Sequence, residues 1–136
     1  MKLQKSSRLA IYALIELAGR SDEKLSVAQL ANIFDISSNH LAKVMHVLVG
    51  AGMVSSARGA SGGYGFCGNA KRTTLLDIIL LFEDLSEGNP NKEHSKNANA
   101  IVRGLDQVMF EIDDIARATL GAITISTMLK QIKGDF

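Results

Sequence analysis

The chain has 136 residues, of which 46% are hydrophobic and 21% charged, so we expect a globular protein rather than a disordered segment. Its single cysteine excludes an intramolecular disulfide and a four-cysteine zinc site. No apolar run approaches the roughly 18 residues of a membrane helix, and Glu16 interrupts the one N-terminal stretch that could be mistaken for a signal peptide. We therefore expect a cytoplasmic protein without a membrane partner.

The net charge of +1 conceals an asymmetry between the two parts of the chain. Residues 1–73 carry nine Lys and Arg against four Asp and Glu, a net charge of +5. Residues 74–136 carry six against ten, a net charge of −4. A basic first part is typical of a protein that presents one surface to a polyanion.

The first fifty residues predict three helices. Apolar spacing indicates a helix over residues 6–20 and a second from Ser26, which can form a capping box with Gln29. Ser37 or Ser38 then begins a third helix that reaches Gly50. Two short helices separated by a turn of a few residues form a helix-turn-helix pattern, which occurs in DNA-binding proteins and also in other helical proteins.

The third predicted helix has two distinct faces. Leu41, Val44, Met45 and Leu48 share the face expected to lie in the core. On the opposite face, Asn39, Lys43 and His46 can donate hydrogen bonds to base edges or phosphates. An ordinary solvated face is also polar, so the pattern favours DNA binding without excluding the simpler interpretation.

A β-hairpin is predicted next. Residues 53–56 form a strand candidate, and the glycine-rich stretch 58–68 supplies a turn and a second strand. Directly after a helix-turn-helix, such a hairpin is the wing of a winged helix, and Arg58 lies where a wing enters the minor groove. Gly63, Gly65 and Gly68 also spell G-x-G-x-x-G. A dinucleotide site needs a buried strand before this motif and a helix after it. Here a glycine-rich turn precedes the motif and residues 69–72 follow it, so we do not expect a dinucleotide site.

The second part of the chain predicts a linking helix over 75–85 with Thr74 as its cap, a polar loop over 86–97, a long helix over 98–120 and a short helix over 124–133. Apolar residues in the long helix step by four and three, as in the seam of a coiled coil: Ile101, Leu105, Val108, Ile112 and Ile115. Because this stripe needs a partner, we expect a homodimer, the alternative being packing within one chain. We accordingly divide the chain into a DNA-binding domain (1–73), a linking helix and loop (74–97), and a dimerisation helix with its tail (98–136).

Several stretches together carry a resemblance to a known family: Met1-Lys2-Leu3, Tyr12-Ala13-Leu14, Ser37-Ser38-Asn39-His40-Leu41, residues 48–54, the R-G-x-x-G-G-Y signature at 58–64, residues 74–78 and Phe82-Glu83. In these the chain resembles the Rrf-type winged-helix repressors of bacteria, the group that includes IscR, NsrR and CymR. The resemblance implies a mainly α fold, a winged helix-turn-helix with a two-stranded β wing and a long C-terminal dimerisation helix. It also implies a transcriptional regulator, a repressor that binds double-stranded operator DNA as a homodimer.

The resemblance also implies where DNA is contacted. The recognition helix would read the major groove, and the wing would enter the minor groove. In the recognition helix the candidate contact residues are Ser38, Asn39, His40 and Lys43, and the helix periodicity adds His46. In the wing they are Arg58, Gly59, Ser61, Gly62, Gly63 and Tyr64.

One feature of the family is missing from this chain. Members that sense iron or nitric oxide hold an iron–sulfur cluster with three cysteines in the loop before the long helix. Here that loop offers only Glu87, Glu93 and His94, whereas such clusters need thiolate or imidazole ligands. We therefore expect neither a metal nor an iron–sulfur cluster; ligation through His94 and carboxylates is the alternative.

Cys67 has two interpretations. We expect a buried residue that fills the hairpin; the alternative is a redox switch beside the DNA surface, where Lys71 and Arg72 would favour the reactive thiolate. No sequence grouping supports Cys67 as a catalytic nucleophile, so we do not expect an enzyme. The remaining alternative function is a winged-helix adaptor controlled by a partner protein. The signal could then be that protein or a small ligand.

Overall fold

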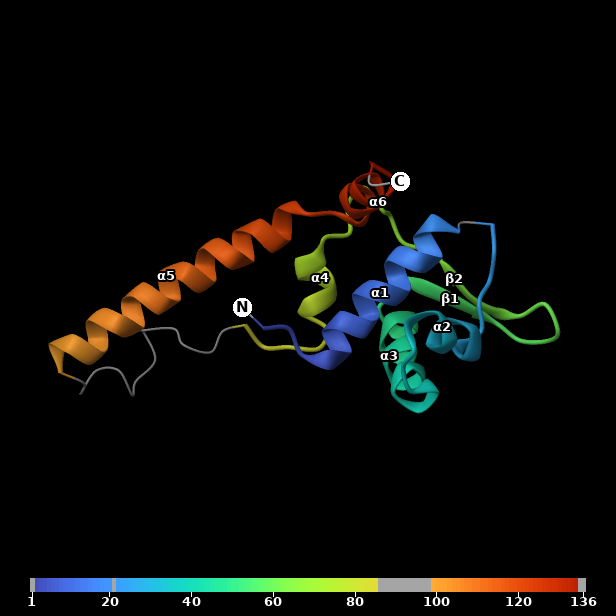
Figure 1. Ribbon diagram of the computed structural model, residues 1–136, viewed down its shortest axis with the longest axis horizontal. Coiled ribbons are helices and arrows are strands. Elements are labelled where there is room, and N and C mark those ends of the chain that lie inside the picture. The colour runs from blue at the N-terminus through green and yellow to red at the C-terminus, as the bar shows by residue number, and fades with distance from the viewer. Residues whose placement is uncertain (1, 21, 86–98, 135–136) are drawn as a thin grey trace.

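The computed structural model describes residues 2–20, 22–85 and 99–134. Six helices and two strands are found in this part of the chain: α1 (Lys5–Gly19), α2 (Val27–Phe34), α3 (Ser38–Gly50), β1 (Val54–Ala57), β2 (Gly63–Phe66), α4 (Leu75–Ile79), α5 (Ala100–Ala122) and α6 (Ile125–Gly134). Figure 1 shows α5 projecting from a body that contains the other elements. This confirms the mainly α winged helix-turn-helix with a two-stranded wing and a long C-terminal helix.

Local side-chain caps define where the helices of the winged helix begin. Ser26 Oγ accepts a hydrogen bond from Gln29 N (3.1 Å), and Gln29 Oε1 accepts one from Ser26 N (2.8 Å), so the predicted capping box is confirmed. Ser37 Oγ caps α3 by accepting from His40 N (3.3 Å). Between α2 and α3, Asp35 takes a left-handed conformation with a φ of 52°. This ends α2 and turns the chain toward α3.

The core is built around α1, which packs against α3, α4 and α6, while α2 packs against α3 and adds buried side chains. The predicted inner face of α3 is confirmed, because Leu41, Val44, Met45 and Leu48 are all buried. Leu14 and Leu17 of α1 are also fully buried, so α1 contacts several neighbouring helices. Burying a side chain of this size stabilises the fold by about 1.5–3 kcal/mol, so four such residues anchor α3 on this core.

The wing is a two-stranded antiparallel sheet with a short third partner. The register pairs Val54 with Phe66 and Ala57 with Gly63. Leu25, from the segment between α1 and α2, bridges to Tyr64: Leu25 N donates to Tyr64 O (3.0 Å) and Tyr64 N donates to Leu25 O (2.7 Å). The base of the hairpin is thereby tied to the helical body.

The structure corrects the predicted end of the linking helix and the predicted start of the long helix. The linking helix was expected to reach residue 85, but α4 ends at Ile79, because Leu81 N and Phe82 N donate to carbonyls three residues back and tighten the chain into a turn. The long helix begins at Ala100 instead of residue 98, since Asn99 Oδ1 caps it by accepting from Val102 N (3.0 Å). The predicted loop over 86–97, with Glu87, Glu93 and His94, lies outside the described residues. Within the described part of the chain, no helix has the length and apolar character that crossing a bilayer requires.

Candidate DNA-binding surface

The outer face of α3 carries the polar residues that the sequence predicts there. Asn39, Lys43 and His46 are exposed, as is Ser38 at the start of the helix. Asn39, Lys43 and His46 lie opposite the buried face, because an α-helix repeats every 3.6 residues. Hydrogen-bond donors of three different kinds therefore face solvent from one helix that is anchored in the core.

His40 differs from these neighbours. It is half-buried, and its Nε2 lies 3.1 Å from Ser6 Oγ in the first turn of α1. The imidazole therefore links the first turn of α3 to the first turn of α1. The predicted contact of His40 with DNA stays a prediction.

The tip of the wing is a tight turn that requires glycine. Gly59 has a φ of 105°, a conformation that residues with a Cβ rarely adopt, and Gly62 N donates to Gly59 O (3.0 Å) to close the turn. A Cβ on Gly62 would lie 2.3 Å from the carbonyl oxygen of Ala57. Arg58 and Ser61 are exposed at this tip. The glycines thus allow a narrow loop that presents a guanidinium and a hydroxyl.

Two of the predicted wing residues have clear structural roles. Gly63 has a φ of 140°, and a Cβ there would lie 2.9 Å from the carbonyl group of Leu25. Tyr64 is half-buried and packs against the core. The sequence pattern did not reveal Leu25 as their partner, because no local signal marks an isolated bridge between distant segments.

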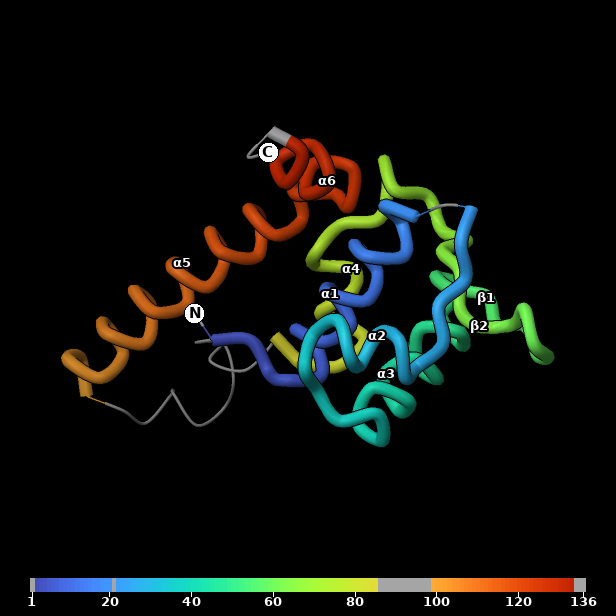
Figure 2. The backbone as a smooth tube through the Cα atoms, turned by 45° about the vertical axis from the view of Figure 1, so that its right-hand side comes forward, coloured from blue at the N-terminus to red at the C-terminus, as the bar shows by residue number. Residues whose placement is uncertain are grey.

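The elements place these groups on one part of the molecule. Figure 2 shows the β1–β2 hairpin extending from the body beside α3, which it directly follows in the chain. Arg58 at the hairpin tip and the outer face of α3 therefore belong to adjacent elements that can approach one duplex. This arrangement can place a helix in the major groove and a basic loop in the neighbouring minor groove.

Cys67 is exposed, so the prediction of a buried residue is wrong. It follows β2 directly, and its Sγ donates to Gly52 O (3.3 Å). Tyr64 and Phe66 supply the apolar contacts to the core from this strand, and the alternation of side chains directs residue 67 away from them. Among the described residues, no group of three or more His, Cys, Asp or Glu could hold a metal ion.

A second surface runs along α5. Its predicted stripe of Ile101, Leu105, Val108, Ile112 and Ile115 is exposed, from 83% at Ile101 to 50% at Val108. The half-buried residues of the helix, which include Phe110, Arg117 and Leu120, lie on another side. The described residues of the same chain therefore leave the apolar stripe uncovered, contrary to the alternative of packing within one chain.

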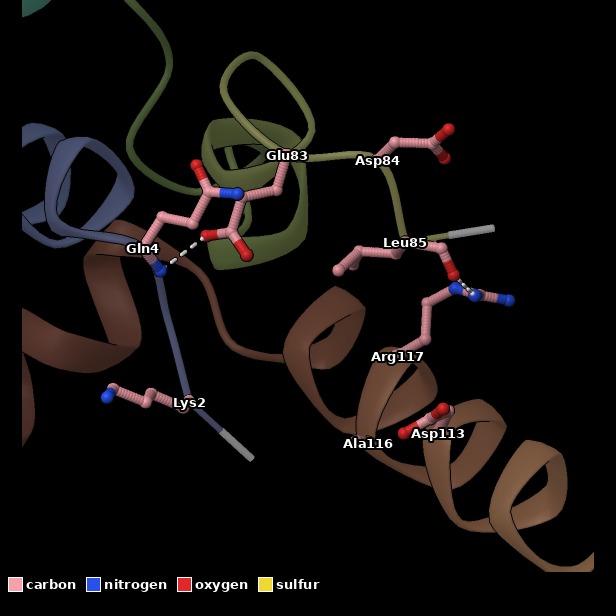
Figure 3. Close-up of a pocket in the computed structure, with 8 residues that line it drawn as sticks. All are labelled: Lys2, Gln4, Glu83, Asp84, Leu85, Asp113, Ala116 and Arg117. Carbon is pink, nitrogen blue, oxygen red and sulfur yellow. Dashed lines mark hydrogen bonds between the residues drawn. The ribbon is translucent and has the colours of Figure 1, made fainter. Parts of the chain in front are cut away.

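A polar cavity of about 280 Å³ lies where α5 meets the body, as Figure 3 shows. Its lining residues are Lys2, Gln4, Glu83, Asp84, Leu85, Asp113, Ala116 and Arg117. The Glu83 carboxylate accepts hydrogen bonds from Gln4 N (3.0 Å) and from the buried Ser7 hydroxyl. The Arg117 guanidinium donates to Leu85 O. These bonds join the start of α1, the segment after α4 and the long helix.

Comparison with known proteins agrees with this geometry. The family model described as Rrf2, iron-dependent transcriptional regulator, matches residues 3–131. A relative from Rhodopseudomonas palustris, the candidate HTH-type transcriptional regulator BadM, is 46% identical over 132 residues, which cover 97% of this chain and 83% of the relative.

Two solved structures share the fold. CymR (YrzC), the global cysteine regulator of B. subtilis, superposes with a TM-score of 0.79 at 25% identity, covering 96% of this chain and 98% of CymR. IscR of T. potens gives a TM-score of 0.77 at 24% identity, covering 97% of this chain and 88% of IscR. The winged helix, the long C-terminal helix and the match over nearly the whole chain lead to one conclusion: the protein belongs to the Rrf2 family of HTH-type transcriptional regulators.

Proposed function

We propose that the protein is a repressor that binds operator DNA as a homodimer, with α3 in the major groove and the β1–β2 hairpin in the minor groove. The observation that carries this proposal is the exposed outer face of α3 beside a glycine-built wing tip with Arg58. A repressor acts here by occupying the operator, so the function requires only specific DNA binding and a signal that releases it.

The exposed side chains have distinct chemistry toward DNA. Asn39 can form two hydrogen bonds with adenine, and Lys43 can donate to the acceptors of guanine. Arg58 suits the negative potential of a narrow minor groove. Ser38, His46 and Ser61 are assigned to base or phosphate contacts around them, and the backbone at Gly59 and Gly62 to close approach of the strand. His40, Gly63 and Tyr64 hold these groups in place through contacts within the chain, and their contacts with DNA stay part of the proposal.

The uncovered stripe of α5 supports the homodimer. Two copies that pack these stripes together place two α3 helices on one duplex, and half-sites then repeat after about one helical turn, roughly 34 Å. The charge division agrees with this arrangement, because the net charge of +5 lies in residues 1–73, which contain the DNA-binding elements.

The donor set of this chain does not fit an iron–sulfur cluster, although the matching family is described as iron-dependent. The single cysteine of the sequence is exposed next to the wing, and such clusters depend on several thiolate or imidazole ligands. The regulatory signal is therefore proposed to be a small ligand or a regulatory protein. The polar cavity beside α5 is where such a signal could alter the link between α5 and the winged helix.

The test uses Lys43→Ala and Arg58→Ala on duplexes selected by the wild-type protein from a random pool. Loss of a base contact should weaken specific binding by roughly 1–3 kcal/mol and relax the preference at one position. Loss of a phosphate contact should weaken binding equally for all sequences. Lys130→Ala on α6 removes a charge outside the proposed surface and serves as the control. Wild-type protein that selects no sequence would support the adaptor function instead.

A further inference from the structure

The first turn of α1 is held in place beside the first turn of α3. Ser6 Oγ lies 3.1 Å from His40 Nε2, which joins the two turns directly. On the other side, Glu83 accepts from Gln4 N (3.0 Å) and from the buried hydroxyl of Ser7. Side chains of this turn are therefore presented at a defined position next to the helix proposed to read the major groove.

This turn presents two cations. Lys5 and Arg8 are exposed and lie on one face of α1, since residues three apart are neighbours on a helix. Neither side chain forms an ion pair with any described residue. Both charges are consequently available to a polyanion.

The same face of α1 borders the helix-turn-helix. Tyr12, four residues after Arg8, stacks on Phe34 at the end of α2, with ring centroids 5.3 Å apart. Figures 1 and 2 both show the start of α1 and the tip of the hairpin on opposite sides of α3. The cations of α1 and Arg58 of the wing therefore flank the recognition helix from two sides.

The dimensions of DNA match this spacing. A helix inserted in the major groove occupies a width of about 12 Å, and a helix packed against it lies about 8–10 Å away. The neighbouring turn then lies over the sugar–phosphate strand that borders the groove. Contacts to phosphates position a protein on the duplex without reading its sequence.

We propose that Lys5 and Arg8 form a phosphate-binding flank, which binds the phosphates of the DNA strand beside the major groove, on the side of α3 opposite the wing. This inference depends on the proposed insertion of α3 and adds a contact that neither α3 nor the wing supplies. The ligand is the phosphate backbone of duplex DNA, so the contribution of this flank is the same for every sequence.

The experiment measures how affinity depends on salt for the variant Lys5→Gln/Arg8→Gln. The probe is one duplex of about 30 base pairs selected by the wild-type protein, long enough for two half-sites. Each phosphate contact makes the slope of log K against log salt more negative by about 0.9. The variant removes two cations from each of two protomers, so the magnitude of its slope should be smaller than that of the wild type by about 3.6. The preferred sequence should stay unchanged, and Arg8→Lys should keep the wild-type slope.

The matched control is Lys130→Gln/Lys133→Gln, which removes two exposed cations from α6. Equal slopes for the α1 and α6 double variants would overturn the inference, and so would a changed sequence preference in the α1 variant. If Lys43→Gln reduces binding while Lys5→Gln/Arg8→Gln leaves the slope unchanged, the phosphate flank fails and the proposed function stands. If the wild-type protein itself selects no duplex, the proposed function fails, and the inference that depends on it fails with it.

Discussion

Leu105 offers a direct test of the proposed dimer. Its side chain lies in the middle of the α5 stripe and is 62% exposed in the single chain. Complete burial of a leucine side chain contributes about 1.5–3 kcal/mol, so covering the exposed part contributes about 0.9–1.9 kcal/mol in each protomer. A symmetric dimer contains this contact twice, which gives about 1.8–3.8 kcal/mol. Because 1.4 kcal/mol corresponds to tenfold, Leu105→Ala should raise the Kd of the dimer by about 20- to 500-fold.

Sedimentation velocity over a dilution series measures this Kd. Gln107→Ala is the control, because Gln107 is exposed on α5 away from the stripe and contributes only a hydrogen bond with Glu111 (3.1 Å). The winged helix should stay folded in Leu105→Ala, since its core includes no α5 side chain among the fully buried residues. A wild-type monomer at micromolar concentration, or the same Kd in both variants, would refute the reasoning.

Three further predictions concern the wing, the core and the thiol. Gly62→Ala should lower DNA affinity in a titration, because its Cβ would lie 2.3 Å from the carbonyl oxygen of Ala57 and distort the wing. Gly50→Ala is the control, because nothing lies within 4 Å of a Cβ there and the wing should stay unchanged. Glu83→Ala should lower the free energy of unfolding in urea by about 1–3 kcal/mol, since it leaves the buried Ser7 hydroxyl without its acceptor. Adding Ser7→Ala should restore part of that loss. If the effects of the two substitutions on the free energy of unfolding simply add, the contact is contradicted. Cys67 should react with iodoacetamide in the native protein, as an exposed thiol does, and a reaction that requires denaturant would disprove this. If peroxide weakens DNA binding of the wild type and not of Cys67→Ser, the thiol is a redox switch.

The features that the sequence predicts correctly are those set by residues close together in the chain. Ser26 and Gln29 form the expected capping box, because both partners of each hydrogen bond lie within one helical turn. The division of α3 into a buried and an exposed face follows from periodicity alone. The stripe on α5 is visible for the same reason, and its exposure in the structure agrees with a need for a partner.

Two errors, the end of the linking helix and the burial of Cys67, lie where packing against other elements decides the path of the chain. Apolar spacing continued past Ile79, so the sequence predicted a longer linking helix, but the chain there turns and Glu83 reaches Gln4, 79 residues away. Cys67 was expected to be buried because the stretch around it is apolar. Its actual position depends on how β2 pairs with β1 and packs on the core.

The amino-acid sequence by itself determined the kind of fold, the caps that begin α2, α3 and α4, the outer face of α3 and the glycine-rich wing. Only the tertiary structure decided how these parts are held: the bridge from Leu25 to Tyr64, the bond between Ser6 and His40 across 34 residues, and the place of Lys5 and Arg8 beside α3. The physical reason is that caps and periodic faces arise from interactions over three or four residues. Bridges and hydrogen bonds between distant segments form only once the core has brought those segments together, and no local pattern encodes them.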